Sequence, residues 1–276
     1  MKLINGKKIA NQILLDIKCQ RSNVKYPHLA VILVGDDPAS HLYVSIKETR
    51  AKEVGIKFTK YILPTETSQT QIIKLIQQLN QNKNITAILV QLPLPQHLNT
   101  NKIINTIDPT KDADGIHPNN LKLLTTKNAP QILPATTGAI IESLKYTKVN
   151  LKNKSVAIIG KSKIVGLPTY NYLKNKCATI NIYDKQTKNL AQKTSQTDIL
   201  IVAIGQANFI TNKYIKPDAV VIDVGINKLN NKIVGDVNFN LVQKKAAWLT
   251  PVPGGIGPIT VAILLKNVLQ LYKYKK

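Results

Sequence analysis

Two side chains in the N-terminal half of the chain have the types and the spacing for proton transfer. Tyr43 and Lys47 are four residues apart in a segment with a helical pattern, so we expect both on one helix face. A lysine beside an aromatic ring in a closed cleft loses solvation, which lowers its pKa and suits a proton shuttle. Because lysine is abundant in this chain, a solvated lysine lying along a helix is the plainer alternative.

Polar side chains also follow other apolar segments. Gln91 ends a strand-like run and precedes a proline-stiffened loop, at the carboxyl edge where α/β sheets bind ligands. Asp112 and Asp114 lie in the acidic loop DPTKDADGIHP, although turn chemistry alone also favours aspartate there.

The loop TPVPGGIGPIT (250–260) is rich in proline and glycine, and such stiffness is typical of a loop that shapes a ligand site.

The segment SVAIIGKSKIVGLP (155–168) has the pattern of a strand, a glycine turn and a helix. In that arrangement backbone N–H groups and a helix N-terminus face a pyrophosphate. The spacing differs from G-x-G-x-x-G because Ser162 stands at the second glycine position, and a Walker loop is excluded because Ser155 stands where its first glycine belongs. An ordinary turn between a strand and a helix is the competing interpretation.

The residue that ends the next strand bears on the choice of cofactor. Asp184 lies about 20 residues after the glycine turn, where Rossmann proteins bind the adenosine ribose, and an acid there favours the free 2′-hydroxyl of NAD. Lys161 and Lys185 flank the same position and could neutralise the 2′-phosphate of NADP. These residues alone therefore leave both cofactors open.

The elements that must position these side chains alternate between apolar runs and stretches of helical period, which is typical of parallel sheets with crossover helices. In the first half we expect strands at 29–35, 56–63 and 85–92 and helices at 39–54 and 68–80. In the second half we expect helices at 136–147, 165–174 and 259–272 and strands at 155–160, 178–184, 198–205, 219–225 and 246–255.

This order predicts an α/β protein with two domains. The first is an N-terminal α/β domain with a mostly parallel sheet, formed by residues 1–137 and joined by a C-terminal helix at about 258–276. The second is a Rossmann-type dinucleotide-binding domain at 138–257.

The net charge of +23 would suit a nucleic-acid-binding module, the main alternative from another class. The basic residues are nearly all lysines, however, spread along the chain, and aromatic residues make up only 5%. Base recognition and stacking depend on arginine and aromatic side chains, so we expect no nucleic-acid partner. A positive field could still attract polyanionic substrates.

The cysteine, histidine and apolar content argues against a disulfide-bonded, metal-binding, exported or membrane protein. Cys19 and Cys177 are far apart, and the histidines are scattered, so we predict no disulfide and no metal site. The chain starts without a signal peptide and lacks an apolar run of the roughly 18 residues that a membrane span requires. We therefore expect a cytoplasmic protein with no membrane partner.

Taken together, the motifs resemble the bifunctional methylenetetrahydrofolate dehydrogenase/methenyltetrahydrofolate cyclohydrolase family. Seven segments match in order over almost the whole chain: SHLYVSIK, VQLPLP, DADG, IIGKSKIVGLP, VVIDVGIN, GDV and TPVPGGIGPIT. The resemblance implies a folate cleft between two α/β domains and a homodimer formed through the cofactor domain. It also implies oxidation of 5,10-methylenetetrahydrofolate to the methenyl form with NADP, followed by hydrolysis to 10-formyltetrahydrofolate.

The resemblance further implies roles for individual residues. Lys47 is the general acid/base, assisted by Gln91, while Tyr43 shapes the folate site and Asp114 holds the pterin. The residues expected at the nicotinamide cofactor are Gly160, Lys161, Ser162 and Ile226, together with Lys185 from its position beside Asp184. The residues expected to line the substrate side of the cleft are Pro253, Gly254 and Gly255.

The chain departs from the family pattern in two places. Ala135 and Thr137 replace the cysteine and the second proline of the family's P-C-T-P, so any function of that thiol is absent. YDKQT (183–187) replaces the usual histidine and serine or arginine at the 2′-phosphate corner. NADP is expected because the family usually uses it. The alternatives are an enzyme that is monofunctional or specific for NAD, and a Rossmann-type dehydrogenase for another small substrate.

Overall fold

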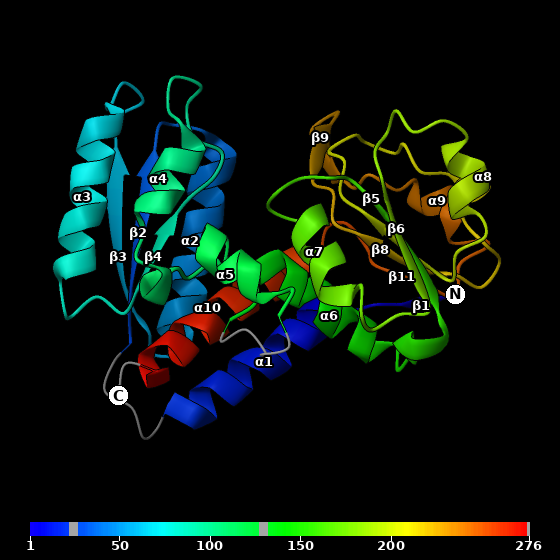
Figure 1. The fold of residues 1–276 in the computed structure, drawn as a ribbon, viewed down its shortest axis with the longest axis horizontal. Coiled ribbons are helices and arrows are strands. Elements are labelled where there is room, and N and C mark those ends of the chain that lie inside the picture. The colour runs from blue at the N-terminus through cyan, green and yellow to red at the C-terminus, as the bar shows by residue number, and fades with distance from the viewer. Residues whose placement is uncertain (22–26, 127–131, 275–276) are drawn as a thin grey trace. The chain divides into compact units, whose positions relative to one another are not determined.

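The computed structural model describes residues 1–21, 27–126 and 132–274 (Figure 1). The chain is an α/β protein that divides into two compact units. The three-stranded unit comprises Asn11–Ala135 and Val261–Lys276, and the six-stranded unit comprises Met1–Ala10 and Thr136–Thr260. Each unit is named here for its main sheet.

The sheet of the three-stranded unit has the order β3-β2-β4, and all of its strands are parallel. Its central strand β2 is buried along its whole length, as expected for a parallel strand of Val, Ile and Leu covered on both faces. Its elements are β2 (His28–Val34), α2 (Pro38–Glu53), β3 (Lys57–Leu63), α3 (Gln69–Gln81), β4 (Ala87–Val90), α4 (Thr100–Thr106), the 3-10 helix η1 (Pro109–Lys111) and α5 (Pro118–Leu123).

Local sequence signals explain where the helices of this unit begin. The Asp37 side chain accepts a hydrogen bond from the Ser40 backbone N–H, and a proline stands in the first turn of α2. Helix α3 begins with a capping box in which Ser68 and Gln71 bond reciprocally. Its apolar face packs in one core cluster with alternate residues of β2, including Ala30. The cap at Asp37 fixes the start of the helix that carries Tyr43 and Lys47.

The sheet of the six-stranded unit has the order β1-β11-β8-β7-β5-β6, again with every pair parallel. The strand order reverses between β5 and β7, so the carboxyl ends of these two strands form the crevice where doubly wound sheets bind ligands. The strands are β1 (Lys2–Leu3), β5 (Ser155–Ile159), β6 (Thr179–Tyr183), β7 (Ile199–Val202), β8 (Val220–Asp223) and β11 (Trp248–Leu249).

The remaining elements include a small antiparallel hairpin. It is formed by β9 (Asn227–Leu229) and β10 (Lys232–Val234). The other helices are α1 (Gly6–Arg21), α6 (Ala135–Tyr146), η2 (Leu151–Asn153), α7 (Gly166–Leu173), α8 (Leu190–Thr194), η3 (Asn212–Tyr214), α9 (Phe239–Val242) and α10 (Ile256–Tyr274).

The structure differs from the sequence-based division at the N-terminus. Residues 1–10 were expected in the first domain, but they belong to the six-stranded unit because Lys2 and Leu3 pair with Trp248 and Leu249 of β11. Two residues are too few for a recognisable strand pattern. Helix α10 also begins at Ile256, earlier than the apolar run suggested, because glycine and proline are tolerated in its first turn.

Within the described residues, no helix has both the length and the apolar character that a membrane crossing needs.

Candidate active site

Lys47 and Gln91 meet in the three-stranded unit. Lys47 lies on α2, and its Nζ donates a hydrogen bond to Oε1 of Gln91 over 2.8 Å. Gln91 directly follows β4 and is buried, because its backbone continues the ladder by donating to the Ile32 carbonyl. The lysine is half-buried and its ammonium group lies against a fixed amide instead of bulk solvent.

The Gln91 amide is held in one orientation. Its Nε2 donates to the Leu92 carbonyl over 2.6 Å, so only Oε1 remains for Lys47. This assignment follows from the bonding partners, since a lysine ammonium is a donor and a carbonyl an acceptor. The amide can therefore accept a hydrogen bond from Lys47 without competing for its proton.

Asp114 is positioned by its neighbour in the acidic loop, Asp112. The backbone around Asp112 pairs with Ile88 of β4, which brings the loop alongside the strand that precedes Gln91. The buried Asp112 carboxylate accepts hydrogen bonds from the backbone N–H groups of Gly115 (3.0 Å) and His117 (2.8 Å). Asp112 thus acts as the internal anchor of the loop, and the loop presents Asp114.

The charges of Lys47 and Asp114 lie close enough to affect each other. Burial lowers the pKa of Lys47, while the negative charge of Asp114 opposes that shift. Burial raises the pKa of Asp114 to about 6, and Lys47 opposes this shift in turn. Both groups therefore titrate closer to neutrality than they would in water, which suits proton exchange with a substrate.

Tyr43 lies one turn before Lys47 on α2 and is half-buried. Burial raises the pKa of its phenol, so the ring stays neutral at physiological pH. The structure thus brings together three of the predicted residues, Lys47, Gln91 and Asp114, and places Tyr43 on the same helix as the lysine.

The predicted dinucleotide turn lies at the carboxyl end of β5. Gly160 has a φ of 121°, and a Cβ at this position would collide with the backbone of Ala203 after β7. Only glycine fits, because the backbone is left-handed and the neighbouring strand ends approach closely. Ser162 Oγ accepts hydrogen bonds from the Val165 and Gly166 backbone N–H groups at the start of α7. This tight turn at the switch point fits a pyrophosphate.

At the position predicted for the adenosine ribose, Lys161 and Asp184 form an ion pair, with Nζ 2.8 Å from Oδ2. Thr187 also donates to the Asp184 carboxylate over 3.0 Å. These contacts hold the pKa of Asp184 below its usual range, the Lys161 hydrogen bond contributing most. Lys185 is exposed beside the pair.

The other predicted residues belong to the same six-stranded unit. Ile226 follows β8 and is 47% exposed, so a ligand can reach it. Pro253, Gly254 and Gly255 form the turn just before α10. Their contribution to a folate cleft stays a prediction. At the first departure from the family pattern, Ala135 is buried at the start of α6 and Thr137 hydrogen-bonds to Thr169.

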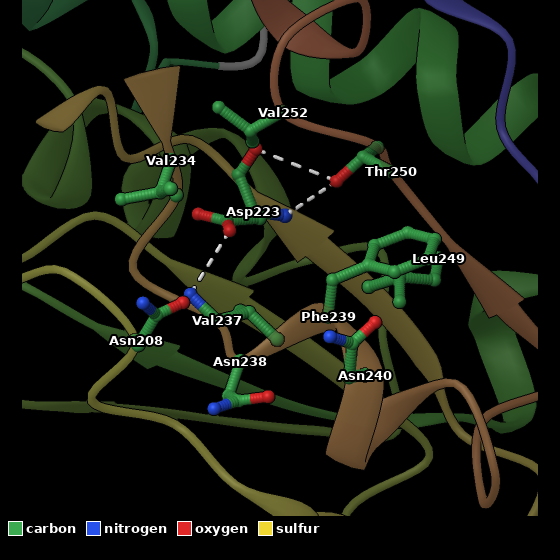
Figure 2. Close-up of a pocket in the computed structure, with 11 residues that line it drawn as sticks. Asn208, Asp223, Val234, Val237, Asn238, Phe239, Asn240, Leu249, Thr250 and Val252 are labelled. Atoms are coloured by element: carbon green, nitrogen blue, oxygen red, sulfur yellow. Dashed lines mark hydrogen bonds between the residues drawn. The ribbon is translucent and has the colours of Figure 1, made fainter. Parts of the chain in front are cut away.

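Sequence reasoning missed two buried carboxylates, Asp223 and Asp236. The first lines a cavity of about 240 Å³ at the carboxyl end of β8 (Figure 2). Its lining residues are Asn208, Asp223, Val234, Gly235, Val237, Asn238, Phe239, Asn240, Leu249, Thr250 and Val252. Burial raises the pKa of Asp223 to about 7. Both lie in segments that match the family, VVIDVGIN and GDV, each with a nearby glycine, but nothing in those segments indicates that the carboxylates are buried.

Among the described residues, no group of three or more His, Cys, Asp or Glu side chains is arranged to hold a metal ion.

Comparisons with known proteins cover almost the whole chain. A family model for the tetrahydrofolate dehydrogenase/cyclohydrolase catalytic domain matches residues 4–114, and the model for the NAD(P)-binding domain of the same family matches residues 134–276. Bifunctional protein FolD of a Nitratiruptor species is 45% identical, over 100% of this chain and 99% of that protein.

Solved structures give the same result. The bifunctional FolD methylenetetrahydrofolate dehydrogenase/cyclohydrolase from Campylobacter jejuni is 40% identical, with a TM-score of 0.96 and 100% of both chains covered. The enzyme from Trypanosoma brucei, complexed with NADP cofactor and inhibitor, is 33% identical, with a TM-score of 0.95 over 99% of this chain and 98% of that one. The chain therefore belongs to the tetrahydrofolate dehydrogenase/cyclohydrolase family.

Proposed function

We propose that this protein oxidises 5,10-methylenetetrahydrofolate to 5,10-methenyltetrahydrofolate with NADP and then hydrolyses the product to 10-formyltetrahydrofolate. The observation that carries the proposal is the Lys47–Gln91 hydrogen bond beside Asp114. Family membership supports both activities, because relatives that match the full length of the chain are named as bifunctional.

For the hydrolytic step, the key group is the Lys47 amine. The methenyl carbon carries positive charge, so water adds to it and must lose a proton as the new C–O bond forms. Because burial lowers the pKa of Lys47, a neutral amine is accessible to take that proton and return it to the folate nitrogen when the C–N bond breaks. Gln91 keeps the amine in place between these two transfers.

The Asp114 carboxylate has a different task. Its partly buried position and raised pKa suit a hydrogen bond to the polar edge of a pterin ring. Its negative charge also favours a cationic substrate carbon nearby, since opposite charges interact strongly away from bulk water. Tyr43 would provide an aromatic wall for the folate.

For the redox step, NADP bound at the Gly160 turn would accept a hydride from the folate methylene carbon. Gly160, Lys161 and Ser162 would hold its phosphates, supported by the tight turn at the start of α7. Ile226 would lie near the nicotinamide, and Lys161 and Lys185 would face the 2′-phosphate. The NADP complex of the Trypanosoma brucei relative supports this choice of cofactor.

NAD is the second candidate cofactor, favoured by one observation. Asp184 carries a negative charge at the ribose position and is already paired with Lys161. A carboxylate there repels a 2′-phosphate and can accept a hydrogen bond from a free 2′-hydroxyl. An NAD-specific enzyme would use the same folate-side residues.

We also propose a homodimer formed through the six-stranded unit. Leu229 and Ile233 of the hairpin are 44% and 43% exposed, and such apolar side chains favour a protein contact. Sedimentation of the wild type and of Leu229→Glu would test the association state. The expected cytoplasmic location, and the expected lack of nucleic-acid, membrane and metal partners, stay predictions.

The decisive experiment follows absorbance of the methenyl product during incubation with methylenetetrahydrofolate and NADP or NAD. The wild type should form the methenyl species and then consume it. Lys47→Met should lose hydrolysis by about 10² to 10⁴-fold, the usual contribution of a positioned acid/base. Lys52→Met, an exposed lysine on the same helix, serves as the matched control. Normal hydrolysis by Lys47→Met would refute the mechanism.

A further inference from the structure

The buried carboxylate of Asp236 joins two loops of the six-stranded unit. Its Oδ2 accepts hydrogen bonds from the backbone N–H groups of Ile204 (2.7 Å) and Gly205 (3.0 Å). Its Oδ1 accepts from the Gln206 backbone N–H (2.8 Å) and from the side-chain amide of Asn227 (2.9 Å). Asp236 itself has no solvent exposure. One side chain therefore holds the turn that follows β7 and the residue that follows Ile226.

A second carboxylate holds the segment that carries Asp236. Asp223, at the end of β8, accepts hydrogen bonds from the backbone N–H groups of Asp236 (3.0 Å) and Val237 (2.9 Å), and Figure 2 shows the second of these bonds. Each carboxylate packs against a glycine that lies next to or near the other aspartate. A Cβ on Gly225 would collide with the Asp236 carboxylate, and a Cβ on Gly235 would collide with the Asp223 carboxylate. The two glycines thus make room for two interlocked carboxylates.

This arrangement lies at the edge of the sheet that matters for cofactor binding. The turn at 204–206 follows β7, one of the two strands at the switch point, and Ile226 follows β8. Loops at the carboxyl ends of such strands form the ligand crevice. Asp236 is completely buried beneath these loops, so it can fix their backbone without contacting a cofactor itself.

We propose that Asp236 is a positioning residue that sets the affinity for the nicotinamide cofactor by fixing the 204–206 turn and Asn227. The inference rests on the proposed function for its choice of ligand. A carboxylate is required because all of the groups that Asp236 contacts are N–H donors. An asparagine in either orientation would turn an NH₂ group toward two of those donors, so at least two bonds would be lost.

The test compares Asp236→Asn with Asp198→Asn, a matched control in the same sheet. Asp198 also accepts backbone and side-chain hydrogen bonds, from Ser155 and Lys216, but it precedes β7 and therefore lies at the opposite edge. Both variants remove one negative charge from the same unit. The measurements are the NADP dissociation constant by calorimetry, the KM for NADP and kcat of the dehydrogenase, and the rate of methenyl hydrolysis, which consumes no nicotinamide.

We expect the NADP dissociation constant and KM to rise at least tenfold in Asp236→Asn, with a smaller change in kcat and hydrolysis within twofold of the wild type. Asp198→Asn should bind NADP as the wild type does. Unchanged NADP affinity in Asp236→Asn would overturn the inference. Equal weakening in both variants would also overturn it, because the effect would then be a general loss of stability.

A milder variant covers the case in which Asp236→Asn does not fold. Asn227→Ala removes only the side-chain bond to Oδ1 and leaves the three backbone bonds in place. It should raise the NADP dissociation constant about threefold, whereas wild-type affinity would overturn the inference. Failure of the proposed function is a separate outcome: the wild type would bind NADP but would not oxidise methylenetetrahydrofolate. The calorimetric comparison of the variants would still test the role of Asp236 in that case.

Discussion

Lys47 and Gln91 are 44 residues apart in the chain, yet a 2.8 Å hydrogen bond joins the ammonium of one to the amide oxygen of the other. The bond links the middle of α2 to the residue that directly follows β4. Because the Gln91 amide is neutral, it fixes the lysine without adding a charge that would hold the proton on it.

Gln91→Glu should make the enzyme dependent on higher pH. A carboxylate in contact with the Lys47 amine would favour its protonated form and raise the lysine pKa by about 1–3 units. The base-requiring limb of the pH profile for methenyl hydrolysis should therefore move to higher pH, with less activity at pH 7. Measurement at saturating folate separates this effect from binding. A profile superimposable on that of the wild type would exclude Lys47 as the titrating base.

Asp114→Asn should shift the same limb in the opposite direction. Asp114 is the negative charge that raises the Lys47 pKa against the effect of burial, so its removal lowers that pKa further. The limb should move to lower pH, while the KM for folate should rise because the proposed contact between Asp114 and the pterin would be weakened. Asp36→Asn, on the loop before α2, provides a control for loss of one negative charge. A shift of the limb to higher pH would contradict the electrostatic interaction between Lys47 and Asp114.

Local pattern predicted the elements that carry Lys47 and Gln91, whereas the roles of Lys47, Gln91 and Asp114 were predicted from the family resemblance. Helical spacing placed Lys47 on α2, and the end of an apolar run placed Gln91 at a strand edge. The central parallel strands were predictable for the same reason, since buried strands are continuous runs of Val, Ile and Leu. The family resemblance then joined segments that periodicity alone leaves separate.

Features that depend on distant partners could not be predicted. The strand β1 has two residues and exists only because β11 offers a free edge. The burial of Asp236 depends on backbone N–H groups 30 to 32 residues away, and nothing in GDV distinguishes it from a solvated turn. Charged residues are rarely buried unless paired, so a sequence reading assigns them to the surface by default.

Asp184→Ser should improve the use of NADP relative to NAD. The change removes a negative charge from the ribose position and frees Lys161 from its 2.8 Å ion pair, so the lysine can face the 2′-phosphate. We expect kcat/KM for NADP divided by that for NAD to rise about tenfold, the effect of one charge-assisted contact. Lys161→Ala is the opposing variant and should lower the same ratio. An unchanged ratio in both variants would mean that residues other than Asp184 and Lys161 determine the cofactor preference.

Acid should destabilise the six-stranded unit partly through Asp198. Hydrogen bonding to Lys216, over 2.7 Å, lowers the pKa of Asp198 from its ordinary 3.8 to about 2. A folded-state pKa below the unfolded one stabilises the protein above about pH 4, and this stabilisation is lost as the pH falls toward 2. Because the pair is partly exposed, its contribution is about 1–2 kcal/mol.

Urea unfolding at pH 7 and at pH 2.5 would measure this contribution. Asp198→Asn should be less stable than the wild type at pH 7, and the difference should shrink at pH 2.5. If the difference in unfolding free energy were the same at both pH values, the charge of Asp198 would make no contribution to stability.

Lys111→Met should destabilise the three-stranded unit more than any exposed lysine substitution. The Lys111 side chain is only 5% exposed. Its Nζ donates to the carbonyls of Leu79 (2.8 Å), Asn80 (2.6 Å) and Asn82 (2.8 Å) at the end of α3. These carbonyls lack partners within the helix, and the positive charge also complements the helix dipole.

Methionine has a similar length but no donor, so the change leaves the three carbonyls without this partner at a cost of about 2–4 kcal/mol. Lys74→Met, an exposed lysine on the same helix, should stay within about 0.5 kcal/mol of the wild type. Because Lys111 directly precedes Asp112, methenyl hydrolysis should also fall as the Asp114 loop loosens. Equal unfolding free energies for the two variants would show that water replaces the lysine at the end of α3 without loss.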